Sequence, residues 1–547
     1  MRKRLSFRLG LTLMAGGLTL GLSAPAATIE VTTPLPRGEV RWTRDNVYVL
    51  NGLVHALSGT ELHIEAGTVI KGRDLGTDAM QRGGLVITRG AKIFAEGTPT
   101  QPIIMTAEAD ELNGNLDIYD RGLWGGLVVL GRTVLNGAAD TTGNVAVPVY
   151  DVYEGLPDVQ IEGEFVHRFG GTDDEDNSGV IRYVSIRHGG ARIEQNKEIN
   201  GLTMGAVGRG TTIEFVEAYA IADDGFEWFG GTVNTRYLVS AFNDDDSFDA
   251  DQGYSGKNQF WFFIQSPDAQ NYGFELNGEV SGTTGDTPRR PYSTFQAYNV
   301  TGIGAGAENP AVGEDNDVFR IREFSTPGIY NGIFTDFSRR GVRIDEKSGQ
   351  FLTDGTLQLT HNLWWGFPGG NTVENLAVDE RARVLFTESG RMNRIEDPRL
   401  RGISREADGG LDPRPATGSP ALDPANVKAV PDDGFYTPVN YVGAFGAGNW
   451  AADWTALSQY GILTASGGYN PVPRPPSSGG GEAPILTAVR EASGLRLTWT
   501  GGVAPFKVLR RAAVAGGGWV EVGTTSEPTF QVPVEGAEGY FRVESAQ

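Results

Sequence analysis

The sequence predicts an all-β protein in which a parallel β-solenoid is followed by a small β-sandwich. Three observations predict this. A strand followed by an acidic turn recurs about every 22 residues, 77 of the 547 residues are glycine, and short alternating strands follow a Pro/Gly-rich stretch near the C-terminus. A period of this length fits one coil of a solenoid, whose apolar face is buried only by stacking on its neighbours.

The repeat is clearest between residues 211 and 253. Asp223-Asp224-Gly225-Phe226-Glu227 aligns with Asp245-Asp246-Ser247-Phe248-Asp249, 22 residues later, and the strand-like runs EFVEAYA and RYLVSAF precede the two copies. Weaker copies follow at Tyr272-Gly273-Phe274-Glu275, Asp317-Val318-Phe319-Arg320 and Arg340-Gly341-Val342-Arg343.

This alignment predicts two columns of stacked side chains, because neighbouring residues of a strand point to opposite faces. The inward column contains Phe226, Phe248, Phe274, Phe319 and Val342. The outward column contains Glu227, Asp249, Glu275, Arg320 and Arg343, on strands about 4.8 Å apart.

Earlier coils are predicted from a second alignment, of residues 62–70 with residues 85–93. Gly67 and Gly90 mark the bend within each coil. Residues 131–178 interrupt the strand pattern, so we expect a long surface excursion there.

Composition and charge exclude several classes of partner. The formal net charge of −22 argues against nucleic acid and anionic membranes. The chain has no cysteine, so disulfides and thiolate chemistry are excluded. Residues 1–26 have the basic start, apolar core and Ala24-Pro25-Ala26 site of a secretory signal peptide, and no later run predicts an integral membrane segment. We therefore expect a secreted protein that is extracellular or at the cell surface.

Several longer motifs resemble a family of secreted bacterial proteins with a right-handed parallel β-helix, related to pectate lyases and without an assigned activity. These motifs are GTELHIEAGTVIKG, GGLVITRGAKIFAEGTPTQPIIMTA, GLWGGLVVLGR, SGVIRYVSIRHGG and DDGFEWFGGTVN. LDPRPATGSPALDPA, residues 411–425, resembles the segment that closes such helices. The resemblance implies an all-β, right-handed parallel β-helix.

The domain boundaries follow from these patterns. We predict a signal peptide over 1–26, the β-helix over 27–395, and a C-terminal cap covering the last coil over 396–470. Residues 471–483, PVPRPPSSGGGEA, form a linker. Residues 484–547 alternate as short strands and resemble a fibronectin type III module.

The two acidic turns predict a candidate Ca²⁺ site. Asp223, Asp224, Asp245 and Asp246 lie at equivalent positions of adjacent coils, where like charges repel. Ca²⁺ takes six to eight oxygen ligands and would offset that repulsion. The alternative is that these carboxylates are solvated turn residues.

A catalytic hypothesis rests on a second resemblance. Polygalacturonase-type hydrolases carry paired aspartates on consecutive coils, then His-Gly and Arg-Ile-Lys. Asp245, Asp246 and Arg320 are the candidate catalytic residues by this resemblance, but Tyr272-Gly273 stands where the histidine is required. A lyase would instead use Asp-bound Ca²⁺ with Arg320 or Arg343 as the base.

The prediction for function is engagement of an extracellular polysaccharide or cell-surface glycan along the outward face. The predicted ligand-binding residues are Glu227, Trp228, Asp249, Trp261, Glu275 and Arg343, with Trp228 or Trp261 expected to be exposed for stacking on a sugar ring. The alternatives are a polysaccharide hydrolase or lyase and a purely structural or adhesion protein. Because the histidine is missing, we expect no efficient catalysis.

Overall fold

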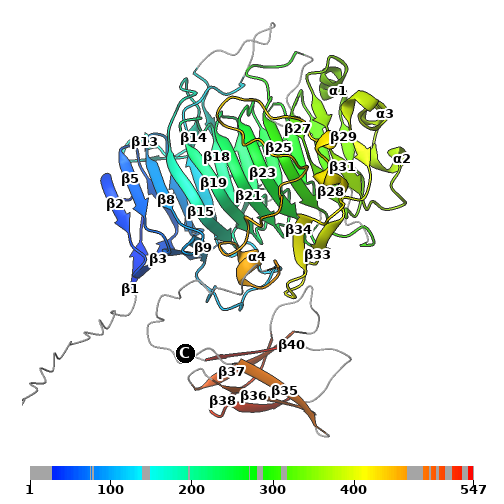
Figure 1. Ribbon diagram of the computed structural model, residues 1–547. Coiled ribbons are helices and arrows are strands. Elements are labelled where there is room, and N and C mark those ends of the chain that lie inside the picture. The colour runs from blue at the N-terminus through cyan, green and yellow to red at the C-terminus, as the bar shows by residue number, and fades with distance from the viewer. Residues whose placement is uncertain are drawn as a thin grey trace, which may run out of the picture.

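The chain folds as a parallel β-helix followed by two small antiparallel sheets (Figure 1). The computed structural model describes residues 27–73, 76, 79–137, 148–194, 197–269, 271–279, 287–309, 317–464, 485–491, 494–500, 504–511, 520–532 and 540–545. The predicted signal peptide and the linker lie outside the described residues. The predicted all-β fold class is confirmed.

One wall of the helix is a sheet of nine short parallel strands, in which each strand contributes one level of the stack. In spatial order these are β4 (Leu53–Ala56), β7 (Gly84–Ile87), β10 (Leu127–Leu130), β18 (Leu202–Gly205), β20 (Phe226–Phe229), β22 (Phe248–Asp251), β24 (Phe274–Asn277), β26 (Phe319–Arg322) and β29 (Val342–Ile344).

The remaining sides of the β-helix are formed by one seventeen-stranded parallel sheet. Its strands are β1 (Ala27–Val31), β2 (Gly38–Trp42), β3 (Asn46–Asn51), β5 (Thr60–Ile64), β6 (Val69–Arg73), β8 (Lys92–Glu96), β9 (Ile103–Ala107), β15 (Gly179–Arg187), β19 (Thr212–Tyr219), β21 (Asn234–Ala241), β23 (Lys257–Ile264), β25 (Gln296–Ile303), β27 (Gly328–Tyr330), β28 (Ile333–Thr335), β30 (Gln358–Thr360), β31 (Leu363–Trp365) and β32 (Arg394–Ile395).

This sheet bends along a line that crosses its long strands. The first half of β15 pairs with β8 and its second half pairs with β9, and Tyr183 lies between the halves with φ +49°. Phe215 and Tyr237 repeat this left-handed conformation in β19 and β21, with φ +54° and +57°. A residue at the bend points its side chain outward while both halves of the strand keep their apolar residues inside.

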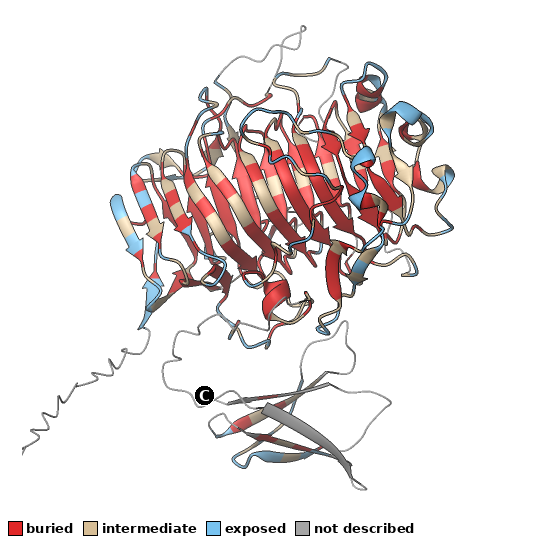
Figure 2. Ribbon diagram, viewed as in Figure 1, coloured by how far each residue is buried: buried red, intermediate tan, exposed pale blue. Residues whose placement is uncertain are grey.

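The core is a column of apolar side chains that runs through the stacked coils. Figure 2 shows most of the β-helix strands as buried. Phe226 pairs with Phe248, Phe248 with Phe274, Phe274 with Phe319, and Phe319 with Val342. All five side chains are at most 1% exposed. The predicted inward column and its register are therefore confirmed.

The predicted register of the first coils is wrong. Leu62 pairs with Ile93 in the next coil, and Leu85 pairs with Val54 and Leu127. Residues 62–70 and 85–93 each consist of strand, glycine turn and strand, but they form different corners of the coil. Because their local sequences are similar, the alignment matched a strand of the seventeen-stranded sheet with a strand of the nine-stranded sheet.

The end of the stack is closed by helices. Short helices follow the last strands, and Phe351, Leu352, Leu376 and Leu385 from them belong to the main core. The helices are α1 (Glu346–Thr353), α2 (Val373–Leu376) and α3 (Val384–Thr387), with the 3₁₀ turns η2 (Arg381–Arg383) and η3 (Ser389–Arg391). An earlier 3₁₀ turn, η1 (Ala79–Gln81), precedes β7.

We had expected the segment 396–470 to cover the last coil. Its described part, residues 396–464, does not do so. These residues run back along the outer face of the seventeen-stranded sheet, ending at α4 (Ala456–Gln459) (Figure 1). The Asn331 side chain bonds Lys428, Gln259 bonds Thr437, and Arg187 bonds Gln459. The segment also contains β33 (Leu400–Ile403), β34 (Leu411–Pro415), η4 (Pro420–Leu422) and η5 (Pro424–Asn426).

The excursion predicted over 131–178 packs on the nine-stranded sheet. Leu135, Tyr153 and Phe169 from it join Val128 and Phe229 in a separate apolar cluster. It carries the two-stranded ribbons β11 (Asp151–Val152) with β14 (Arg168–Phe169) and β12 (Gln160–Ile161) with β13 (Glu164–Phe165). A further ribbon, β16 (Arg192–Glu194) with β17 (Lys197–Glu198), follows β15.

The C-terminal module consists of two three-stranded antiparallel sheets. One contains β35 (Ile485–Glu491), β36 (Gly494–Thr500) and β39 (Thr529–Val532), and the other contains β37 (Phe506–Arg511), β38 (Val520–Thr525) and β40 (Tyr540–Ser545). Trp499 and Val532 of the first sheet pack with Phe506 and Val543 of the second. This is the small β-sandwich that the alternating pattern predicted.

Candidate functional site: an acidic cluster and a charged column

A column of charged side chains runs along the outer face of the nine-stranded sheet. Glu227 pairs with Asp249, Asp249 with Glu275, Glu275 with Arg320, and Arg320 with Arg343. All five are half-buried. The structure therefore has the outward column that the sequence predicted, with its change from acidic to basic.

The turns that precede β20 and β22 add further carboxyl groups beside this column. Asp224 Oδ1 accepts a hydrogen bond from the backbone N–H of Asp246 in the next coil, at 2.9 Å. Asp246 Oδ1 in turn accepts from the N–H of Tyr272, at 2.7 Å. These two carboxyl groups thus tie consecutive turns together, and both residues are buried rather than solvated.

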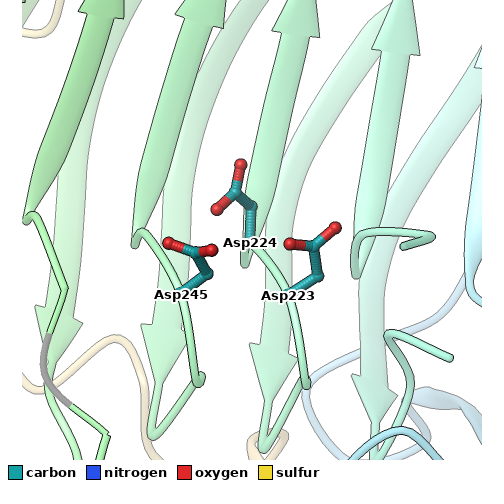
Figure 3. A group of neighbouring side chains, drawn as sticks. All are labelled: Asp223, Asp224 and Asp245. Atoms are coloured by element: carbon teal, nitrogen blue, oxygen red, sulfur yellow. The ribbon is translucent and has the colours of Figure 1, made fainter. Parts of the chain in front are cut away.

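Two groups of carboxylates come close enough to share a cation. Single oxygens of Asp223, Asp224 and Asp245 all lie within 4.8 Å of one another, as do those of Asp224, Glu227 and Asp249. Figure 3 shows Asp223 and Asp245 on neighbouring turns with Asp224 between them. Of the four predicted Ca²⁺ ligands, Asp246 is in neither group, and one oxygen of its carboxyl group accepts from the Tyr272 N–H.

Burial and like charge raise the pKa of these acids. The pKa of Asp224 lies well above its ordinary value, mainly because the side chain is buried and also because of the nearby charges of Asp223 and Asp246. The pKa of Glu227 is raised well above its ordinary value by burial, Asp249 and Asp223. For Asp249 the causes are burial, Glu275 and Asp251. The cluster therefore holds excess negative charge that a proton or a cation can relieve.

Asp249 has a further unsatisfied atom. Its Oδ1 is shielded from water and has no hydrogen-bond partner among the described residues. A buried carboxylate oxygen without a partner is costly. Asp249 belongs to the second carboxylate group, so the unsatisfied oxygen lies on a carboxyl group that already contributes to a candidate cation site.

The basic end of the column is organised by ion pairs. Arg322 donates to Asn277 Oδ1 at 2.5 Å and forms an ion pair with Glu275. Arg343 Nε donates to Asp317 Oδ2 at 2.8 Å. Asn277 and Arg322 are outward residues two positions after Glu275 and Arg320, so extending the alternation along each strand would have predicted them.

The three proposed catalytic residues are not brought together. Asp245 and Asp246 precede β22, whereas Arg320 lies on β26, two strands farther along the sheet. Two strand spacings amount to about 9.6 Å. Asp245 accepts a hydrogen bond from Asn271 and Asp246 from the Tyr272 N–H, so neither carboxyl group is directed to Arg320.

The prediction that Trp228 or Trp261 is exposed is wrong. Trp228 shares the inward face of β20 with Phe226, and both tryptophans are at most 1% exposed. Their rings stack with centroids 5.1 Å apart. Since side chains alternate along a strand, the residue that follows outward Glu227 must point inward. These two residues stabilise the core.

Two residues at the acidic end of the column were missed by sequence analysis: Tyr153, from the excursion, and Asn200, just before β18. Tyr153 lies on the outer face, with its hydroxyl 3.2 Å from Thr203 Oγ1. Asn200 donates to Glu227 and, at 3.1 Å, to Thr203 Oγ1. Asn200 and Tyr153 are 27 or more residues from Glu227 in the sequence, so no local pattern connects them to the column.

Comparison with known proteins supplies one match. A family model described as a pectate-lyase like beta helix domain matches residues 35–363, more than half of the chain. No curated protein and no solved structure matches the sequence. Among the described residues, no helix has the length and apolar character needed to cross a membrane.

Proposed function

The chain belongs to the pectate-lyase-like β-helix family, and from this membership we propose that it is a secreted protein, extracellular or at the cell surface, that engages polysaccharide along the charged column. The observation that carries the proposal is the line of charged side chains on consecutive strands, from Glu227 to Arg343. Groups repeated at about 4.8 Å favour an extended polymer over a compact small molecule.

Ca²⁺ is part of this proposal. Asp223, Asp224 and Asp245 offer only oxygen ligands, and their separation and excess charge fit a hard divalent cation. Glu227 and Asp249 would take part through the second group, which shares Asp224. Bound Ca²⁺ would supply positive charge at the acidic end, where it can attract carboxylates of an acidic polysaccharide. Arg320 and Arg343 would attract the same polymer at the basic end.

A hydrolase or lyase is the second candidate, and the raised pKa of Asp224, Glu227 and Asp249 favours it. A carboxyl group that stays protonated near neutral pH can serve as a general acid. The candidate base Arg320 lies two strands away from Asp249, and the polygalacturonase-type histidine is replaced by Tyr272. We therefore propose binding without efficient cleavage.

The test measures binding and cleavage together. Mature protein is titrated into pectin, alginate and xylan with Ca²⁺ or with chelator, and reducing ends and unsaturated products are followed in the same samples. We expect Ca²⁺-dependent binding of at least one acidic polymer with background turnover. Asp223→Asn and Arg320→Gln should each weaken binding, whereas Asp45→Asn, at an exposed loop, is the matched control.

Two results would contradict the proposal. Robust turnover that Asp245→Asn or Asp246→Asn abolishes would establish the enzyme. Absence of binding to all three polymers, with Ca²⁺ present, would favour a structural or adhesion role for the β-helix.

A further inference from the structure

A second surface of the β-helix carries a ladder of aromatic rings. At the bend of the seventeen-stranded sheet, the outward side chains of Tyr183, Phe215, Tyr237 and Phe260 stack face to face. The ring centroids are 4.4, 4.2 and 4.8 Å apart along this series. The ladder belongs to the seventeen-stranded sheet, whereas the charged column belongs to the nine-stranded sheet.

The returning segment 396–464 packs on this ladder and forms a pocket with it. Trp450 meets Tyr237 edge to face at 5.2 Å and stacks on Phe445 at 4.9 Å. Trp450 Nε1 donates to the carbonyl of Ala444, which holds the indole in place. The pocket has a volume of about 340 Å³ and is lined by Tyr237, Tyr441, Gly446, Ala447, Gly448, Asn449 and Trp450. This volume is at the lower end of the range for small-molecule sites.

One polar side chain in the pocket wall is unsatisfied. The amide oxygen and nitrogen of Asn449 are both shielded from water, and neither has a hydrogen-bond partner within the described part of the chain. Leaving a buried amide without partners costs free energy, so such a group calls for an explanation. If the Asn449 side chain turns toward the pocket, a ligand with adjacent donors and acceptors would satisfy both atoms.

The remaining polar groups of the pocket are neutral. Burial, with a smaller contribution from Tyr237, raises the pKa of Tyr441 to about 12, so its phenol stays protonated and can donate. No lysine, arginine, aspartate or glutamate is among the lining residues. The pocket therefore offers aromatic surface, phenol hydroxyls and one amide, without a charge to pair with an anionic ligand.

We propose that this pocket binds a neutral sugar ring. A pyranose has C–H groups that pack on aromatic rings and neighbouring hydroxyls that both donate and accept hydrogen bonds. The wall of Tyr441 and Trp450 suits the C–H groups, and the Asn449 amide, once its side chain turns toward the pocket, suits a pair of hydroxyls. A uronate ring is disfavoured, because nothing in the wall offsets its carboxylate and the protein carries a net charge of −22.

The inference does not rest on the function proposed for the charged column. The two sites differ in chemistry, since the column is charged and elongated, whereas the pocket is neutral and opens to solvent. A protein with both sites could hold one glycan by its neutral residues and another by its acidic residues. Failure at one site leaves the other unaffected, and variants at each site separate the two outcomes.

The experiment uses the mature chain with cellohexaose, xylohexaose, mannohexaose and hexagalacturonate as probes. Binding is measured by titration calorimetry and by saturation-transfer NMR. We expect at least one neutral hexasaccharide to bind. Asn449→Ala should weaken that binding about tenfold through loss of hydrogen bonds. Tyr441→Ala should weaken it by at least as much.

Three controls accompany these variants. Tyr150→Ala changes an exposed tyrosine whose ring carries the Arg89 guanidinium, and it should leave binding unchanged. Asp249→Asn, in the charged column, should also leave neutral binding unchanged. Thermal melting of each variant verifies the fold, and Trp450 is left intact because it packs on Phe445.

The proposal is overturned by any of three results. The first is that none of the neutral hexasaccharides binds the mature protein. The second is that a neutral hexasaccharide binds equally well to the parent, Asn449→Ala and Tyr441→Ala. The third is that Asp249→Asn abolishes neutral binding, which would place that ligand on the column instead.

Discussion

At the scale of single residues, Asp249 combines the features that define the acidic cluster. It stands between Glu227 and Glu275 on the outward column, and one of its oxygens is buried without a partner. Burial and Glu275 raise its pKa well above the ordinary value. The negative charge of Asp249 therefore destabilises the metal-free fold while contributing to any cation site.

Replacing Asp249 by asparagine should separate these two effects. In chelator at pH 7, Asp249→Asn should raise the melting temperature, because it removes a carboxylate whose charged form is disfavoured by burial and by Glu275. With Ca²⁺, the variant should gain less stability than the parent, since it has lost one anionic ligand. Melting curves of both proteins in the two buffers provide the measurement. If Ca²⁺ stabilises neither protein, the cation proposal fails.

Phe248 is the corresponding test of the inward column. Its ring lies 4.5 Å from that of Trp261 and within 6 Å of Phe226 and Phe274. Phe248→Asp would bury an unpaired charge among these rings and should cost more than about 4 kcal/mol. Phe248→Leu, the apolar control, should cost about 1–2 kcal/mol. Denaturant unfolding measures both, and equal stability of Phe248→Asp and the parent would refute the register.

At the scale of elements, two buried charged side chains, Glu217 and Arg187, are bridged by the Ser185 hydroxyl and hold the returning segment to the β-helix. Glu217 on β19 accepts hydrogen bonds from Ser185 and from the N–H groups of Ala456 and Leu457 at the start of α4. Arg187 on β15 donates to Gln459 in α4 at 2.6 Å. Both charged side chains are fully buried. The charged side chains of β15 and β19 are therefore hydrogen-bonded by groups of α4.

Removing Glu217 should release this end of the segment. Glu217→Ala leaves the Arg187 charge buried and unbalanced, at a cost of about 3–5 kcal/mol. Glu214→Ala, on the same strand, removes only the ion pairs with Arg182 and Arg236 and should cost about 1 kcal/mol or less. Hydrogen exchange of 456–459 should accelerate only in Glu217→Ala. Unchanged protection there would show that apolar packing alone holds α4.

The sequence predicts elements well where one coil copies the next. The Asp-Asp turns at 223 and 245 are separated by one complete coil, so their alignment is the true register of β20 and β22. Alternation also places Trp228 inward, although we expected an exposed tryptophan. The path of 396–464 is not predictable in this way. It depends on contacts such as Glu217 with Ala456, 239 residues apart, and no periodicity connects them.

At the scale of the whole molecule, two sets of buried groups make stability respond to pH in opposite directions. Five carboxyl groups of the acidic cluster have a raised pKa in the folded protein: Asp224, Glu227, Asp246, Asp249 and Asp251. His55 and His167 form a buried pair with Nε2 atoms 2.9 Å apart, and both have a lowered pKa. For His55, burial is the main cause and the pKa falls to about 3.

The signs follow from which state binds the proton more tightly. The folded protein binds protons to the five carboxyl groups more tightly than the unfolded chain does. Their contribution is therefore fully present below about pH 4 and is lost as the pH rises through the raised pKa values. The unfolded chain binds protons to the two histidines more tightly. Their contribution is present above about pH 6.5 and declines as the pH falls toward 3.

Four further carboxyl groups have a raised pKa, Asp176, Glu217, Glu279 and Asp317, and two further histidines have a lowered one, His188 and His361. The nine carboxyl groups outnumber the four histidines, so chelated protein should melt at a higher temperature at pH 5 than at pH 7. Saturating Ca²⁺ should reduce this difference, because the cation neutralises at pH 7 the charge that protons neutralise at pH 5. Asp249→Asn should reduce it as well, whereas Asp45→Asn should not. Melting temperatures at the two pH values, with Ca²⁺ and with chelator, test each statement. A chelated protein that is more stable at pH 7 would show that the histidines outweigh these carboxyl groups.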